Sequence, residues 1–159
     1  MVILGLDVGE VRIGVACSDD MEIIARPIQT VRRKSNAQAF DAISRIAGEQ
    51  GAERIVVGLP ISFDGQLHAQ ARRIQAFAGK LGQHMSLPIT FADESLSTVR
   101  AEELLRSAGV RPERIHERLD AAAAAVMLQD YLDARRQAHQ AAPLEDSPGV
   151  PPDASDTKL

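Results

Sequence analysis

The segment from Val2 to Val8 restricts the fold of this chain more than any other. It is almost uniformly apolar, a pattern typical of a strand with both faces buried in the middle of a sheet. Only Asp7 interrupts it near its carboxyl end. Burying a carboxylate without a partner costs several kcal/mol, so an aspartate in such a strand needs a chemical reason. The segment therefore predicts a central strand that carries a functional acid.

Two further β-type runs follow with short connections. Ile13 to Ser18 comes after the turn Gly9–Arg12, and Ile23 to Val31 contains Pro27. Because proline cannot donate to a sheet ladder, the third strand is expected at an edge. Three consecutive strands joined by short turns predict an antiparallel meander.

The apolar period then changes from two to about 3.6 residues, and helices alternate with strands. Gly51 stands where the C-terminal cap of the first helix is expected, and Ser97 is a favourable N-cap for the third. Such alternation implies parallel strands joined by right-handed crossovers. The predicted helices span residues 36–50, 67–84, 97–108 and a last one from near 117 or 120 to about 140, and the predicted strands between them span 54–58 and 87–92.

The order βββαβαβαα predicts one α/β domain over residues 1–140, with a mixed five-stranded sheet flanked by helices. A chain of 159 residues has the length of a single domain and can bury one core. From Ala141 onward Pro, Ser, Asp and Gly predominate, which predicts a disordered, acidic, proline-rich tail over residues 141–159.

The composition is that of an ordinary globular protein in a reducing compartment. No run of about 18 apolar residues is present and the first residues carry no basic leader, so we expect a cytosolic protein without a membrane partner. Cys17 is the only cysteine, which excludes an internal disulfide and a multi-cysteine zinc site. Core packing is the preferred role for Cys17, with an intermolecular thiol as the alternative.

The net charge of −4 argues at first against a nucleic-acid partner. The stretch from Ala141 to the end holds four acids and one base, however, so the body carries only −1 of this charge. Bases of the body occur in clusters, each of which can face phosphate or form a solvated surface. These clusters are Arg32-Arg33-Lys34, Arg72-Arg73, the set Arg111, Arg114 and Arg118, and Arg135-Arg136.

Three acids occupy positions where a merely soluble fold would carry apolar residues. Besides Asp7, Glu94 follows the strand Ile89–Ala92, at the end where ligands bind in open parallel sheets. Asp120 begins a stripe that faces the sheet, and the small residues 121–125 allow a close approach of this helix.

Convergence of Asp7, Glu94 and Asp120 would create a repulsion that only cations relieve. Oxygen ligands of this kind suit Mg²⁺ or Mn²⁺. Two such ions about 4 Å apart can activate a water and stabilise a leaving oxygen without a nucleophilic side chain. The three acids are therefore predicted as metal ligands and catalytic residues for phosphoryl chemistry.

Each acid also has a structural alternative. These are an ion pair of Asp7 with Arg12 or turn hydrogen bonds from the amides of residues 9 and 10, a surface position for Glu94 with Asp93 pointing inward instead, and a helix N-cap role for Asp120.

Four motifs, in order and at compatible spacing, match one family pattern over about residues 1–135. They are Leu4–Ala16 (LGLDVGEVRIGVA), Val56–Pro60 (VVGLP) with Asp64-Gly65, Asp93–Thr98 (DESLST) and Asp120–Leu128 (DAAAAAVML). Together they resemble the YqgF/RuvX family, whose members are named as pre-16S rRNA nucleases and as Holliday junction resolvases. The resemblance implies a ribonuclease H-like nuclease domain with its acids at Asp7, Glu94 and Asp120.

The resemblance further implies a Mg²⁺- or Mn²⁺-dependent endonuclease that hydrolyses phosphodiesters of structured nucleic acid and processes the 5′ end of pre-16S rRNA. A resolvase of branched DNA and a non-catalytic RNA-binding ribosome assembly factor are the alternatives. Expected partners are structured RNA or branched DNA, with the small-subunit ribosomal precursor and a second copy of the chain as further candidates. An Asp-x-Gly hairpin also opens the actin and sugar-kinase folds, but their two lobes need a longer chain.

Arg12, Ser97 and Thr98 are the expected substrate-binding residues. A salt bridge from Arg12 to Asp19 or Asp20, and helix capping by Ser97 and Thr98, are the alternatives. The family's first turn usually reads Gly-Thr-Lys-Arg, whereas this chain has Gly9-Glu10-Val11-Arg12. The replacement removes a hydroxyl and a base, and Glu10 is expected to be a solvated turn residue or a supplementary metal ligand.

Overall fold

The computed structural model describes residues 1–61, 68–94 and 97–141. Its elements follow the predicted order without exception. They are β1 (Val2–Val8), β2 (Arg12–Ser18), β3 (Ala25–Arg32), α1 (Asn36–Gln50), β4 (Ala52–Leu59), α2 (Ala69–His84), β5 (Ile89–Asp93), α3 (Ser97–Ser107) and α4 (Pro112–Ala141).

All five strands form one mixed sheet in the order β3-β2-β1-β4-β5. β1 lies in the middle, as its apolar run predicts, and pairs antiparallel with β2 and parallel with β4. β2 and β3 complete the antiparallel meander, and β4 and β5 pair in parallel. The strand that contains Pro27 lies at an edge, which confirms the prediction drawn from that proline.

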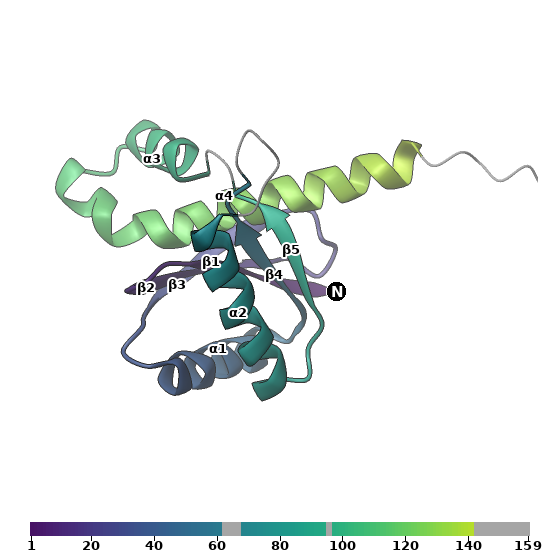
Figure 1. The fold of residues 1–159 in the computed structure, drawn as a ribbon. Helices are drawn as coiled ribbons and strands as arrows, with labels where there is room; N and C mark the ends of the chain where they lie inside the picture. The colour runs from purple at the N-terminus through teal and green to yellow at the C-terminus, as the bar shows by residue number, and fades with distance from the viewer. Residues whose placement is uncertain (62–67, 95–96, 142–159) are drawn as a thin grey trace, which may run out of the picture.

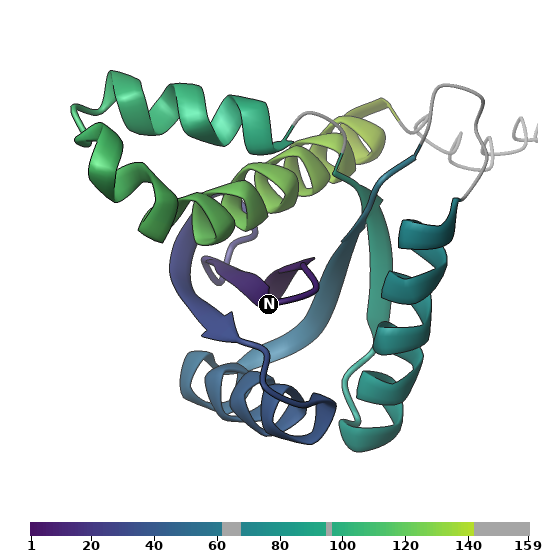
Figure 2. The same ribbon diagram turned by 60° about the vertical axis from the view of Figure 1, so that its left-hand side comes forward.

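The two faces of the sheet are covered by different helices (Figures 1 and 2). α1 and α2 lie on one face, whereas α4 crosses the other and carries α3 on its outer side. Alternation along β1 divides its side chains accordingly: Leu4, Leu6 and Val8 belong to the core with α1 and α2, and Ile3 belongs to the core with α4.

Large side chains fill the face covered by α1 and α2. Phe40 of α1 and Phe77 of α2 contact each other with ring centroids 5.1 Å apart. Cys17 is buried in the same core, which confirms the expected packing role. α1 has the predicted ends: the Ser35 hydroxyl accepts from the amide of Gln38, and Gly51 has the left-handed conformation of a C-cap, with φ 66°.

The last helix begins earlier than the sequence pattern predicts. α4 starts at Pro112, and proline is common in the first turn of helices because its missing N–H would have no partner there. Asp120 therefore lies inside the helix, and the N-cap alternative for this residue is wrong. The other predicted boundaries differ by a few residues at most.

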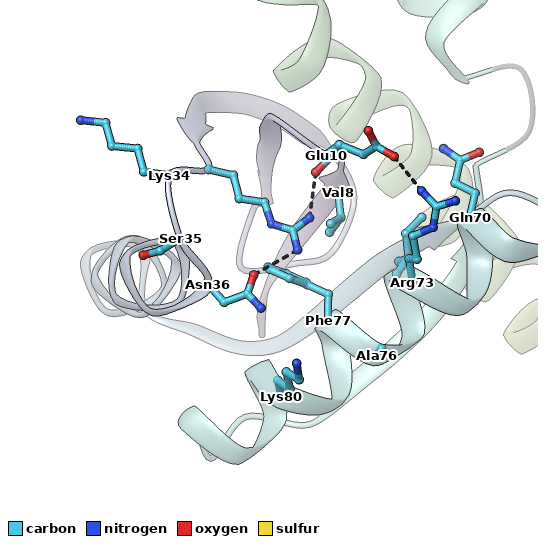
Figure 3. Close-up of a pocket in the computed structure, with 13 residues that line it drawn as sticks. Val8, Glu10, Lys34, Ser35, Asn36, Gln70, Arg73, Ala76, Phe77 and Lys80 are labelled. Atoms are coloured by element: carbon cyan, nitrogen blue, oxygen red, sulfur yellow. Dashed lines mark hydrogen bonds and ion pairs between the residues drawn. The ribbon is translucent and has the colours of Figure 1, made fainter.

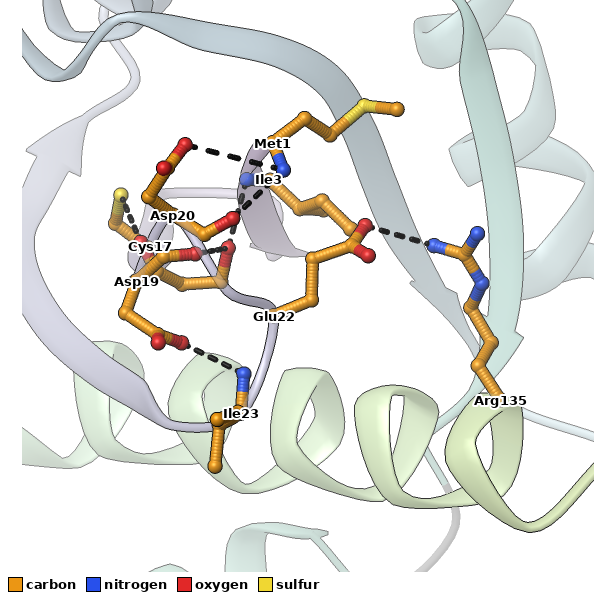
Figure 4. Close-up of polar contacts among 9 residues, drawn as sticks. Met1, Ile3, Cys17, Asp19, Asp20, Glu22, Ile23 and Arg135 are labelled. Carbon is orange, nitrogen blue, oxygen red and sulfur yellow. Dashed lines mark hydrogen bonds and ion pairs between the residues drawn. The ribbon is translucent and has the colours of Figure 1, made fainter. Parts of the chain in front are cut away.

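The turn between β2 and β3 contacts the C-terminal half of α4 (Figure 4). The Asp19 carboxylate accepts from the amides of Ile23 and Ile24 at 2.7 and 2.9 Å, and these bonds hold its pKa below the usual value. Glu22 pairs with Arg135 of α4 at 3.1 Å. This turn follows the carboxyl end of β2, so Asp19 is a whole strand away from Arg12.

No helix within the described ranges combines the length and apolar character needed to cross a membrane. The predicted disordered tail begins at Ala141, which is the last residue of α4, and residues 142–159 lie outside the described residues. The same holds for Asp64-Gly65 of the second motif.

Candidate active site

Asp7 lies at the carboxyl end of β1 on the face covered by α4. Its position follows from the alternation of the strand, in which Gly5, two residues earlier, lies against Leu128 of α4. The carboxyl group of Asp7 is hydrogen-bonded to that of Glu94 and lies within electrostatic range of Asp120. All three predicted acids therefore belong to one face and one end of the sheet.

Glu94 is fixed by its backbone directly after β5. Its N–H donates to the carbonyl of Leu59 at 3.1 Å, which continues the β4–β5 pairing by one step. Its carbonyl accepts from the amide and the hydroxyl of Ser97 at 3.0 and 2.7 Å. Glu94 thus faces Asp7, while Asp93 is exposed, so the surface alternative for Glu94 is wrong.

Ser97 holds the backbone of Glu94. Its side chain is only 3% exposed, and its hydroxyl donates to the Glu94 carbonyl. Thr98, the other residue of this motif expected to meet substrate, is exposed on the first turn of α3. Through these contacts Ser97 positions Glu94.

Two strand glycines make room for the acids. A Cβ atom at Gly58 would lie 2.6 Å from Glu94 Oε2, and one at Gly14 would lie 1.9 Å from the backbone oxygen of Asp120. Gly14 also pairs directly with Asp7 across β1 and β2. A side chain at Gly14 would push α4 away from the sheet, and one at Gly58 would displace the Glu94 side chain.

Asp120 is held by Arg12. The Arg12 Nε donates to Asp120 Oδ2 at 2.8 Å, and the aspartate side chain is 26% exposed. The ion pair joins the start of β2 to α4. The alternatives that paired Arg12 with Asp7, Asp19 or Asp20 are therefore wrong.

The Asp7–Glu94 pair has unusual acidity. Burial, the charge of Asp7 and the hydrogen bond to Asp7 raise the pKa of Glu94 to about 8, with a smaller contribution from Asp93. Burial also raises the pKa of Asp7, the hydrogen bond from Glu94 opposes this rise, and the charge of Asp120 adds to it. At neutral pH the two carboxyls share a proton unless a cation takes its place.

The donor set fits a hard divalent cation. Glu94 Oε2 is buried and has no hydrogen-bond partner within the described part of the chain, so it offers an unused carboxylate oxygen beside Asp7. Among residues 1–61, 68–94 and 97–141, no three His, Cys, Asp or Glu side chains are gathered closely enough to hold an ion as they stand. Asp7 and Glu94 are thus already in contact, whereas Asp120 is bound to Arg12.

Sequence reasoning missed the roles of several residues around the acids. Gly14 and Gly58 belong to the quoted motifs, and a glycine inside a strand is itself a signal of close approach by another group. Glu10 was expected to be solvated or to hold metal. It is 81% exposed and pairs with Arg73 of α2 at 2.7 Å, which no local pattern could indicate.

Solved structures share the architecture of this domain. RuvC of Thermus thermophilus in complex with a Holliday junction substrate matches with a TM-score of 0.55 at 16% identity, over 86% of this chain and 96% of that one. The fowlpox virus resolvase in complex with Holliday junction DNA matches with a TM-score of 0.53 at 9% identity, over 85% and 99%. The chain therefore has a ribonuclease H-like fold of the RuvC type, as expected.

Sequence comparison assigns the family. Residues 1–134 match the family model described as "RuvX: Holliday junction resolvase". A protein of Chloroflexus aggregans named "Putative pre-16S rRNA nuclease" is 47% identical over 134 residues, 84% of this chain and 94% of its own length. One of the same name from Thermosynechococcus vestitus is 42% identical over 139 residues, 87% and 92%. The chain belongs to the RuvX family, which confirms the resemblance.

Proposed function

We propose that this protein is an endonuclease that hydrolyses phosphodiesters of structured nucleic acid with Mg²⁺ or Mn²⁺. The observation that carries the proposal is the hydrogen-bonded Asp7–Glu94 pair, whose pKa values are both raised at the end of the central sheet. Membership of a family described as a resolvase, with relatives named as nucleases, supports the same chemistry.

Asp7, Glu94 and Asp120 are the residues that would hold the cation. A bound divalent ion supplies the positive charge that activates water and stabilises the leaving oxygen of a phosphodiester. The chain contributes two carboxyls already in contact and a third on α4 beside them. Ser97 keeps Glu94 in place through its backbone, as its two hydrogen bonds show.

Arg12 has two roles in the proposed function. It neutralises Asp120 in the described conformation, and its side chain is 54% exposed at the edge of the site. If Asp120 joined Asp7 and Glu94 as a cation ligand, Arg12 would lose its acidic partner. Its guanidinium would then be free to bind a substrate phosphate, a role expected for this residue from the sequence.

Precursor 16S rRNA, cleaved at its 5′ end, is the substrate we propose. The curated relatives carry that RNA in their names and cover most of this chain. Aromatic residues make up only 3% of the sequence, so the surface has little to stack on unpaired bases. Recognition by backbone and shape suits a structured RNA, and we expect the protein to meet this precursor in the cytosol.

The experiment is cleavage of a pre-16S rRNA fragment and of a four-way DNA junction side by side, with Mg²⁺, Mn²⁺ or EDTA. A metal-dependent product from the RNA at its 5′ end supports the proposal. A product from the junction alone identifies a resolvase of branched DNA instead. RNA binding without any metal-dependent product identifies a non-catalytic assembly factor and overturns the enzyme assignment.

A further inference from the structure

A basic pocket opens on the side of the sheet away from the carboxylates (Figure 3). It lies between the β1–β2 turn, the start of α1 and one side of α2, with a volume of about 530 Å³. Among the described residues, four cationic residues and one acid, Glu10, line it. The cations are Arg33, Lys34, Arg73 and Lys80.

Arg33, one of the lining residues, is held by three contacts. Its Nη1 donates to the carbonyl of Gly9 at 3.1 Å and its Nη2 to Asn36 Oδ1 at 3.0 Å. The guanidinium also lies over the Phe77 ring, 4.6 Å from its centroid. These bonds use two of the five N–H donors of the guanidinium, so a preorganised cation keeps donors for a ligand.

The other three cations are exposed and come from two elements, and the side chain of Lys34 points outward from the other lining residues (Figure 3). Lys34 precedes α1, and Arg73 and Lys80 lie two helical turns apart on α2. Of these three, Arg73 alone has an acidic partner within residues 1–61, 68–94 and 97–141, namely Glu10. Phe77 is just 2% exposed, so the pocket offers charge and donors but no aromatic surface for a base. This chemistry recognises phosphate.

The pocket and the carboxylates share one end of β1. Val8 lines the pocket and directly follows Asp7, and neighbouring Cα atoms are about 3.8 Å apart. Strand alternation sends Asp7 to the α4 face and Val8 to the α1–α2 face. The acids and the basic pocket therefore lie on opposite faces of the sheet beside the same β1–β2 turn, past which a bound strand would run from the acids to the cations.

We propose that the basic pocket is a second, non-catalytic subsite that binds backbone phosphates of the substrate beyond the scissile bond. This inference rests on the proposed function, from which the bound polyanion is taken to be nucleic acid. The cations of the pocket hold the nucleic acid while the acids on the opposite face perform hydrolysis. The pocket thereby supplies the positive charge that a domain of negative net charge needs to bind a polyanion.

The test is binding of a fluorescent 24-base-pair RNA duplex and, separately, of inorganic phosphate to the full chain in EDTA. The duplex affinity is measured over a series of salt concentrations. The test variant is the double substitution Lys34→Gln/Lys80→Gln. The control, Arg45→Gln/Arg106→Gln, removes the same charge from exposed helix positions outside the pocket. Thermal unfolding checks that both variants fold.

We expect the test variant to bind the duplex at least about tenfold more weakly at 0.1 M salt and to lose about 2 from the slope of log affinity against log salt. The control should keep most of the duplex affinity and most of the slope of log affinity against log salt. Equal loss in the two variants, or none, overturns the proposal. Loss of phosphate binding with unchanged duplex binding shows a site for a free anion and also overturns it. Because EDTA prevents metal chemistry, this result is independent of whether the protein cleaves anything.

Discussion

The two faces of the central sheet are packed in opposite ways. Towards α1 and α2, the sheet presents large aliphatic residues that meet Phe40 and Phe77. Towards α4, it presents Gly5 and Gly14 beside Ile3, Ala16 and Val56, and the helix contributes Ala124 together with Met127, Leu128 and Leu132. Large side chains bury more apolar area and so contribute more stability, whereas small ones let two backbones approach. The face covered by α1 and α2 therefore contributes more to stability, and glycines on the other face let the sheet and α4 lie close together.

The electrostatics of the two faces differ in the same sense. The close-packed face brings carboxyls together, at a free-energy cost that appears as the raised pKa values of Asp7 and Glu94. The α1–α2 face instead gathers cations at its rim. The destabilising arrangement is thus confined to the face that carries the three acids.

The largest expected effect comes from removing one charge of the close-packed face. Asp7→Asn should lower metal-dependent cleavage by at least about a thousandfold, roughly 4 kcal/mol of barrier, because one oxygen ligand of the cation is lost. Stability should not fall, since the substitution removes a carboxylate whose burial is costly and asparagine keeps an oxygen that can accept from Glu94. Single-turnover cleavage and urea unfolding measure the two quantities.

Asp41→Asn on α1 is the matched control, because it makes the same chemical change at an exposed acid that pairs with His84. It should leave the cleavage rate within about twofold. Undiminished cleavage by Asp7→Asn would remove Asp7 from the site.

The next effect tests proximity itself. Gly14→Ala places a methyl group 1.9 Å from the Asp120 carbonyl oxygen, so α4 must move away from the sheet. We expect a loss of about 3 kcal/mol in the free energy of unfolding, at the upper end of overpacking effects, together with slower cleavage. Gly48→Ala in α1, where nothing lies within 4 Å of the new Cβ, should instead stabilise the protein by roughly 0.5–1 kcal/mol. Equal stabilities of the two variants in urea would contradict the proximity argument.

Much of this architecture was accessible from local sequence patterns. The order of elements, the central strand, the edge strand with Pro27 and the C-cap of α1 each depend on neighbours in sequence. The start of α4 was not found, because the stretch before Asp120 lacks a clear apolar stripe although Pro112 marks the true beginning.

The candidate site also has residues that the sequence indicates and contacts that it does not. Asp7, Glu94 and Asp120 stand out because acids are costly where their neighbours are apolar, and a family pattern supports them. The pairing of Arg12 with Asp120 spans 108 positions and that of Glu10 with Arg73 spans 63, so no local rule indicates either. Long-range partners of exposed charges are set by the tertiary fold.

A third effect concerns the pH dependence of stability without metal. Between the unfolded pKa of about 4.5 and the folded value of about 8, Glu94 keeps a proton in the native state that the unfolded chain releases. Stability must therefore fall as pH rises through this window. We expect a decrease of about 2 kcal/mol from pH 5 to pH 8, less than the full shift implies because small rearrangements let water reach the charge.

Glu94→Gln is the control, because glutamine keeps the shape and cannot titrate. Urea unfolding in EDTA should show a flatter pH profile for this variant, and Mg²⁺ should flatten the wild-type profile by replacing the proton. Parallel profiles for the two proteins would show that Glu94 does not carry the effect.

The smallest effect concerns the turn that separates the two faces. Glu10→Thr/Val11→Lys restores the residues usual in the family, adds two units of positive charge and frees Arg73 from its ion pair. Both partners of that pair are exposed, so stability should change by less than about 0.5 kcal/mol. Affinity for the RNA duplex in EDTA should rise roughly threefold at 0.1 M salt and converge with the wild type at high salt, because the added contacts are purely electrostatic. Glu49→Thr/Ala52→Lys, with the same charge change away from the turn, should give a smaller rise. If both double variants gain the same affinity for the duplex, the added charge acts regardless of its position. The turn then does not guide a strand from the acids to the basic pocket.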